Sequence, residues 1–133
     1  MKFILMMHAP RASGDWDVAK WSADDQQAMF GFMKALNEGL NEEGVFVSGE
    51  GLSPPGEARV VRASQGGEGP EVTDGPYAES KEFLAGYWIV DVETPEQAYA
   101  IAARASVAPG PGGKPMYLKI EVRQVMSAPP VEP

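Results

Sequence analysis

Residues 83–92 read Phe-Leu-Ala-Gly-Tyr-Trp-Ile-Val-Asp-Val, and this stretch decides the fold. Strict alternation along a strand would place Phe83, Ala85, Tyr87 and Ile89 on one face and Leu84, Gly86, Trp88 and Val90 on the other. Both faces are then apolar, whereas a half-exposed antiparallel strand would alternate between apolar and polar residues. The pattern therefore predicts that both sides of the sheet are covered. Helices of the same chain would cover one side, and we expect a second subunit to cover the other.

Other segments of the chain also have the composition of strands. Short apolar runs bounded by glycine or proline predict strands at 2–8, 45–50 and 58–63, and a clean apolar–polar alternation predicts the last strand at 116–123. Residues 71–73 are predicted to pair back across the glycine-rich turn at 64–69, which would make a hairpin with the strand at 58–63.

Two segments have helical spacing and recognisable ends. Ser22 is a predicted N-cap, and the helix after it is expected to stop at Gly44. Its apolar stripe consists of Met29, Phe32, Met33, Leu36 and Leu40. The second helix begins at Thr94-Pro95, where Gln97 completes a capping box. A single helical turn is expected at 78–82.

The predicted order is β-α-β-β-(β)-β-α-β, which indicates an α+β domain. Without the middle hairpin it is the ferredoxin-like β-α-β-β-α-β pattern, with both helices on one face of an antiparallel sheet. A chain of 133 residues is the size of one domain. We assign the domain to residues 1–126 and a proline-rich tail to 127–133.

Composition excludes several classes of function. The formal net charge of −8 argues against sequence-independent binding to nucleic acid or to an anionic membrane. The chain has no cysteine and a single histidine, so we expect no metal site; no dinucleotide fingerprint is present, so we expect no cofactor. No apolar run is long enough for a signal peptide or a membrane span, which predicts a soluble, cytoplasmic protein.

Residues 72–82 read Val-Thr-Asp-Gly-Pro-Tyr-Ala-Glu-Ser-Lys-Glu. This segment resembles the motif that names the DGPF family, part of the YCII-related group, which is usually spelled D-G-P-F-A-E-T-K-E. Tyr77 stands for Phe and Ser80 for Thr. Similar segments occur at 49–52 (Gly-Glu-Gly-Leu), at 85–88 (Ala-Gly-Tyr-Trp) and at 120–125, so the resemblance spans about residues 1–126.

The resemblance implies a ferredoxin-like fold that pairs into a dimeric α/β barrel. Some YCII-related members are thought to be enzymes that use a His–Asp pair in a cleft. DGPF members are often associated with genes for extracytoplasmic-function sigma factors, which implies a regulatory role and a sigma-factor partner. One departure is Ser53, where the nearest subgroup often has His, so no role of that His transfers to this chain.

The candidate catalytic residues are His8 and Asp74. His8 ends the first strand, and histidine is the usual proton-transfer group near neutral pH; the alternative is a histidine that is hydrogen-bonded at a sheet edge. Asp74 would orient His8 or act as a base, as the family's His–Asp pair implies. The alternative is an aspartate that stabilises its own turn before Gly75-Pro76.

The candidate substrate-binding residues are of three kinds. Glu50 lies between two glycines, a pattern that suits a ligand or a bulge. Cations such as Arg59 and Lys81 could hold a substrate carboxylate or could form surface ion pairs. Tyr77 and Trp88 could line an aromatic pocket or belong to the core or the dimer interface. Residues 110–114 are predicted to be a turn, because no helix follows their glycines as a P-loop requires.

Two functions from different classes remain open. The first is a cofactor-free small-molecule enzyme that performs hydrolysis, elimination or isomerisation with His8 and Asp74 in a cleft. The alternative is a metabolite-binding or regulatory module linked to an extracytoplasmic-function sigma factor. A dimeric accessory protein without chemistry is a third reading.

Overall fold

The computed structural model describes residues 1–11, 17–76 and 80–126. Its strands and helices, in chain order, are β1 (Lys2–Pro10), α1 (Ala23–Glu42), β2 (Phe46–Gly51), β3 (Arg59–Ala63), β4 (Pro70–Asp74), β5 (Glu82–Asp91), α2 (Pro95–Ser106) and β6 (Ile120–Gln124). The described residues also form short 3₁₀ turns, namely η2 (Val18–Lys20), η3 (Pro55–Glu57) and η4 (Pro111–Gly113).

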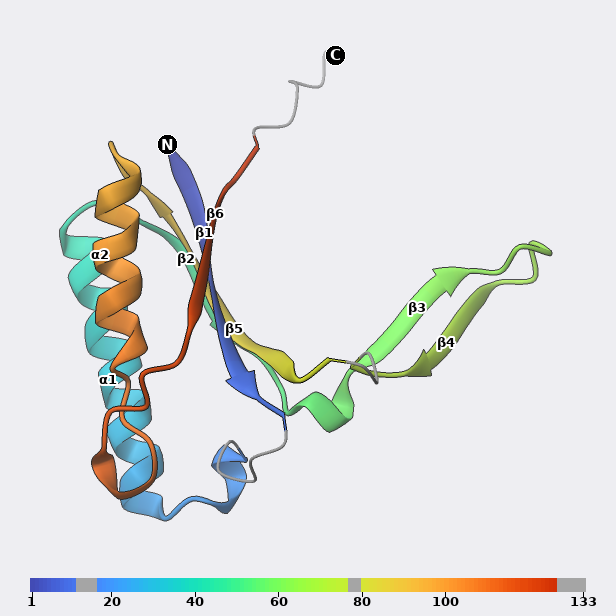
Figure 1. Cartoon of the computed structure of the whole chain (residues 1–133), viewed down its shortest axis with the longest axis horizontal. Coiled ribbons are helices and arrows are strands. Elements are labelled where there is room, and N and C mark those ends of the chain that lie inside the picture. The colour runs from blue at the N-terminus through green and yellow to red at the C-terminus, as the bar shows by residue number, and fades with distance from the viewer. Residues whose placement is uncertain (12–16, 77–79, 127–133) are drawn as a thin grey trace.

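Four strands form one antiparallel sheet in the order β2-β5-β1-β6, and β3 pairs with β4 in a separate hairpin. Figure 1 shows α1 and α2 on one side of the four-stranded sheet, while the hairpin extends away on the other side. This arrangement confirms the α+β class, and its strand order fits the ferredoxin-like pattern with an inserted hairpin.

The helix ends follow the local signals in the sequence. Ser22 caps α1, because its Oγ accepts a hydrogen bond from the backbone N–H of Asp25 at 3.2 Å. At α2, Thr94 Oγ1 accepts from the Gln97 backbone N–H at 3.3 Å, and Gln97 Oε1 accepts from the Thr94 N–H at 3.1 Å. Both predicted caps are therefore confirmed. Gly44 follows the end of α1 with a left-handed φ of 76°, a conformation that glycine adopts without strain.

The core lies between the sheet and the two helices. Every second residue of β1 is buried on the helix side, namely Phe3, Leu5, Met7 and Ala9. Two buried leucines of α1, Leu36 and Leu40, pack against this face. The buried stripe of α2 consists of Ala98, Ile101, Ala102 and Ala105, and its small alanines let the helix approach the sheet closely. Burial of this apolar surface is the main force that stabilises the domain.

The strand at 83–92 does not alternate strictly, and that prediction was wrong at its first residues. Met7 pairs with Gly86 but His8 pairs with Leu84, so β5 carries a bulge at Ala85. Phe83 therefore pairs with Ala9 and returns to the helix side of the sheet. A bulge inserts one unpaired residue and reverses the alternation beyond it.

The last strand is shorter than predicted. It begins at Ile120 rather than at 116, because Met116 and Leu118 bond to the last residue of α2 and to the segment just after it, and β1 bonds to this stretch only through the His8 N–H, which donates to the Lys119 carbonyl. Met116 N–H donates to the Ala108 carbonyl at 3.0 Å and Leu118 N–H to the Ser106 carbonyl at 3.2 Å. Tyr117 between them has a positive φ of 50°, which interrupts a strand.

The turn predicted at 110–114 is confirmed: residues 111–113 form η4, and Gly110 and Lys114 flank it. The Asp25 carboxylate accepts a hydrogen bond from the Gly112 N–H at 3.1 Å, so the turn is fastened to the start of α1. The helical turn expected at 78–82 lies partly outside the described residues, and its last residue, Glu82, opens β5. The tail at 127–133 also lies outside them.

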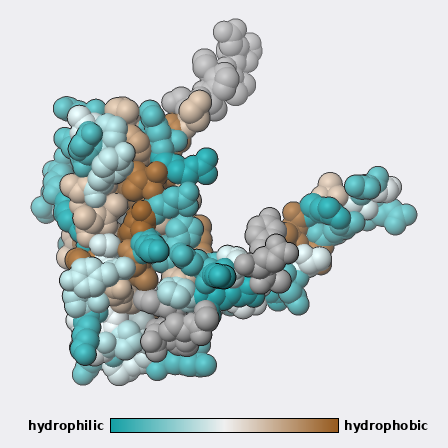
Figure 2. All heavy atoms as spheres, in the orientation of Figure 1, coloured by the Kyte–Doolittle hydropathy of each residue, from teal (hydrophilic) through white to brown (hydrophobic). Residues whose placement is uncertain are grey.

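The side of the sheet that faces away from the helices is called the open face here. Ile4, Met6, His8 and Ile89 lie on it, and each is only partly buried. On the hairpin, Val61 pairs with Val72 and both are more than half exposed. Figure 2 shows hydrophobic residues down the body of the molecule and again on the hairpin. No helix in the described part of the chain is long and apolar enough to cross a membrane.

Candidate ligand pocket

A pocket of about 610 Å³ lies on the helix side of the sheet. Its walls come from β1, α1, η2, the end of β2 with the segment after it, the first half of β5, and the stretch just before β6. The large apolar side chains in these walls are Met7, Val18, Trp21, Met29, Phe30, Met33, Leu52, Phe83, Trp88, Met116 and Leu118. The space is therefore lined mainly by aromatic rings and thioethers, and it opens to solvent beside the exposed Phe30 and Leu52.

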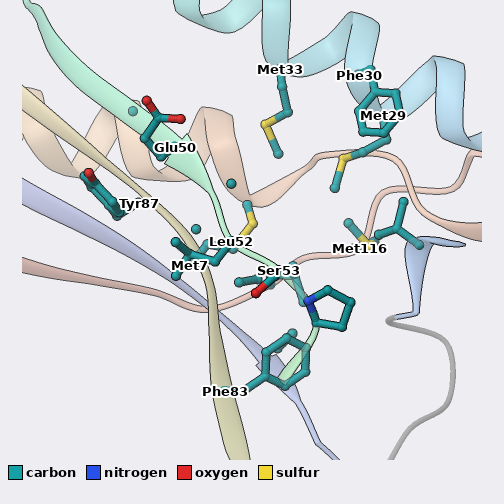
Figure 3. A pocket seen from close by; sticks show the side chains of 18 of the residues that line it. Met7, Met29, Phe30, Met33, Glu50, Leu52, Ser53, Phe83, Tyr87 and Met116 are labelled. Atoms are coloured by element: carbon teal, nitrogen blue, oxygen red, sulfur yellow. The ribbon is translucent and has the colours of Figure 1, made fainter. Parts of the chain in front are cut away.

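Four methionines contribute to these walls from three separate parts of the chain. Met29 and Met33 reach from one turn of α1 toward Leu52 and Ser53, with Phe83 and Met116 nearby (Figure 3). Methionine is unbranched and polarizable, so it adapts its shape to an irregular neighbour. The lining can therefore adjust to a ligand without movement of the backbone.

Two side-chain hydrogen bonds support the walls. Trp88 Nε1 donates to Asn37 Oδ1 at 2.8 Å, which ties the middle of α1 to β5. Gln26 Nε2 donates to the Val18 carbonyl at 2.9 Å and to the Trp21 carbonyl at 3.3 Å, which ties η2 to the first turns of α1. These links hold α1 against its neighbours around the pocket.

Glycines allow the sheet to form the floor of the pocket. Gly51 pairs with Gly86, which brings the segments 49–52 and 85–88 side by side. A Cβ at Gly86 would lie 2.9 Å from the Glu50 carbonyl oxygen, and one at Gly49 would lie 2.9 Å from Trp88 Cδ1. The close approach of β2 and β5 therefore requires glycine at positions 49 and 86. This requirement is a structural reason for the glycines in the segments 49–52 and 85–88.

Two of the predicted substrate-binding residues, Trp88 and Glu50, line this pocket. Trp88 is buried and forms part of the wall. Glu50 is exposed and pairs with Tyr87, and the two side chains lie at one end of the pocket, apart from Met29 and Met116 (Figure 3). Glu50 therefore contributes to the rim rather than to the interior.

His8 lies on the open face, away from the pocket. Its Nε2 is 3.1 Å from Glu121 Oε1 on the neighbouring strand β6. Asp74 lies at the end of β4, where its carboxylate is 3.7 Å from Arg59 Nε and 95% exposed. Within the described residues the structure brings His8 together with Glu121 and Asp74 with Arg59, and it records no contact between His8 and Asp74.

The remaining candidates lie elsewhere. Arg59 donates from Nη1 to the carbonyls of Gly56 and Ala58, at 3.2 and 2.8 Å, so it fastens the base of the hairpin. Neither Arg59 nor the exposed Lys81 lines the pocket. Tyr77 lies outside the described residues.

Most of the residues that line the pocket have no signal in the sequence that marks them as ligand-binding. Met29 and Met33 were assigned only to the apolar stripe of the first helix, and Met116 only to a strand. Asn37, a polar residue next to the apolar stripe of the first helix, is the one signal that the sequence offers for this pocket, because a partly buried amide needs a hydrogen-bond partner.

The architecture and the pocket define an α+β domain with a ligand-sized, mainly apolar pocket between a helix and a sheet. The chain belongs to the YCII-related domain family, whose family model matches residues 1–110. This membership confirms the resemblance that rested on residues 72–82 and the segments around them. No curated protein matches the chain.

Proposed function

We propose that this protein binds a small, largely apolar molecule in the pocket between α1 and β5. The observation that carries the proposal is the volume of about 610 Å³ with mainly apolar walls. Ligand pockets typically enclose about 300–1,000 Å³ and have apolar walls with a few fixed polar groups. Asn37, Gln26 and Ser53 are such polar groups in this lining. The function is that of a metabolite-binding module.

An uncharged fluorescent probe tests this proposal. N-phenyl-1-naphthylamine gains fluorescence in apolar surroundings, so its titration with the purified chain measures binding. We expect saturable binding that the substitution Met33→Trp weakens at least tenfold, because the indole fills part of the pocket. Met126→Trp is the matched control, since Met126 is 88% exposed and lies outside the lining. Equal binding by both variants would contradict the proposal.

A second candidate is acid–base catalysis on the open face. The contact that favours it is His8 Nε2 to Glu121 Oε1 at 3.1 Å, because a carboxylate that holds one ring nitrogen orients the other for proton transfer. Glu121 would then take the orienting role that the sequence assigned to Asp74. Hydrolysis, elimination and isomerisation are the reactions that such a pair supports. His8→Ala with unchanged turnover of an identified substrate would exclude this candidate.

We also propose that the chain forms a homodimer through the open face. Ile4, Met6 and Ile89 are partly exposed there, and covering them would remove apolar surface from water. The hairpin of β3 and β4 extends on this side of the sheet (Figure 1), and an isolated two-stranded hairpin is marginally stable in water. Contact with a second copy would stabilise it. A dimer of this kind would also shield His8 from solvent.

A further inference from the structure

The orientation of the Asn37 amide follows from its partner. The indole Nε1 of Trp88 is only a donor, so the oxygen of the Asn37 amide must face it, at 2.8 Å. The amide nitrogen Nδ2 therefore points in the other direction along the amide plane. The sequence separation of the two residues is 51, so the bond is a property of the tertiary structure.

The Asn37 Nδ2 group is a donor without a recorded acceptor in the described part of the chain. Asn37 is partly buried and lies in the pocket lining. A ligand that covered this amide without accepting from it would leave two N–H groups desolvated and unpaired, which is unfavourable. A ligand oxygen beside Nδ2 would satisfy the group, so the site selects for an acceptor.

The charges around the pocket argue against an anionic ligand. The described lining contains no Lys, Arg or His, and its one charged residue is the acidic Glu50 at the rim. The whole chain carries a formal charge of −8. A carboxylate or phosphate would lose its hydration in this pocket without finding a cation. The acceptor is therefore expected on an uncharged molecule.

The walls favour an aromatic ligand over a flexible alkyl chain. Phe30, Phe83, Trp21 and Trp88 present rings, and four methionines present thioethers. Aromatic pairs and sulfur–aromatic contacts each add to the gain from apolar burial. A flat ring can contact several of these groups at once and loses little conformational freedom on binding.

Building on the pocket binding proposed above, we propose that the ligand is an uncharged aromatic molecule with a carbonyl or hydroxyl oxygen, and that Asn37 Nδ2 donates a hydrogen bond to this oxygen. Asn37 is then a specificity-determining residue, and Trp88 is the residue that positions it. The substrate carboxylate that Arg59 and Lys81 were predicted to hold has no counterpart in this ligand.

Three naphthalene compounds of the same ring size test this assignment by calorimetry on the full chain. 2-Acetylnaphthalene carries a neutral acceptor, 2-ethylnaphthalene carries none, and 2-naphthoate is an anion. We expect the ketone to bind several-fold to about tenfold more tightly than the ethyl compound, the range that one net hydrogen bond supports. The naphthoate should bind at least about tenfold more weakly than the ketone, because it finds no cation in the lining.

A conservative substitution then tests the role of Asn37. Asn37→Asp keeps an oxygen for Trp88 but replaces the donor Nδ2 by a second oxygen. We expect it to abolish the preference for the ketone while it changes the affinity for the ethyl compound by less than the affinity for the ketone. Asn41→Asp, one turn further along α1 at an exposed position outside the lining, adds the same charge and should keep the preference.

The outcomes separate this inference from the pocket binding on which it rests. Binding of both neutral compounds without preference for the ketone, or tightest binding of the naphthoate, overturns the ligand class but leaves pocket binding intact. Absence of binding by all three compounds counts against pocket binding itself. The ligand comparison uses the unmodified chain, so it decides the question even if Asn37→Asp does not fold.

Discussion

The substitution Gly86→Ala tests how closely β2 and β5 approach at the floor of the pocket. The added Cβ would lie 2.9 Å from the Glu50 carbonyl oxygen and 3.4 Å from Gly51 Cα. Both are backbone atoms, so no side-chain rotation relieves the first contact and the strands must move apart. Overpacking of this kind costs about 1–3 kcal/mol. Alanine also has less conformational freedom than glycine in the unfolded chain, which stabilises the folded state by about 0.4–1 kcal/mol. The expected net loss in the free energy of unfolding is about 1–2 kcal/mol. We expect a value of about 1 kcal/mol, because β2 is an edge strand and can move away from β5.

Gly31→Ala is the matched control, because it makes the same chemical change at an exposed position of α1 with no atom within 4 Å of the added Cβ. Alanine stabilises an exposed helix position by about 0.5–1 kcal/mol relative to glycine. Urea denaturation, followed by far-UV circular dichroism, measures both variants. We expect free energies of unfolding that move in opposite directions. If Gly86→Ala were as stable as the parent chain, the close approach of the two strands would be refuted.

Three further predictions concern the caps, the support of the pocket and the association state. Ser22→Ala should lower the free energy of unfolding by about 1 kcal/mol, since it removes the acceptor of the Asp25 N–H; an unchanged urea midpoint would argue against the cap. Trp88→Phe should lower the free energy of unfolding by about 1–3 kcal/mol, because it removes the hydrogen bond to Asn37 and part of the packing. Asn37→Leu should lower the free energy of unfolding less in the Trp88→Phe variant than in the parent chain, because the bond is already absent there. Light scattering should give twice the chain mass of 14.3 kDa, and a stable monomer would contradict the dimer.

The local elements of this protein could be predicted from the sequence because their signals lie within a few residues of each other. The caps at Ser22 and Thr94 are sequence-local hydrogen bonds, and the order of strands and helices indicated the ferredoxin-like pattern. The segment at 72–82 also led to the YCII-related family, which the family model confirms. These features need no knowledge of which distant residues meet.

The errors arose where pairing between distant segments decides the outcome. The bulge at Ala85 depends on how β5 pairs with β1, and the late start of β6 depends on bonds from residues 116 and 118 to the end of α2 and the segment just after it. Strand propensity contains neither kind of information, because it describes one segment at a time. The partner of His8 is likewise a matter of sheet order, since β6 with Glu121 lies beside β1.

The amino-acid sequence by itself therefore determined the class of fold, the helix ends and the family. Only the tertiary structure decided that Met29, Met33 and Met116 line a pocket rather than a filled core, because an apolar stripe looks the same in sequence whether its neighbours fill the space or leave it open. It also decided that the Asn37 amide oxygen faces the indole of Trp88, because the two residues are 51 positions apart in the sequence.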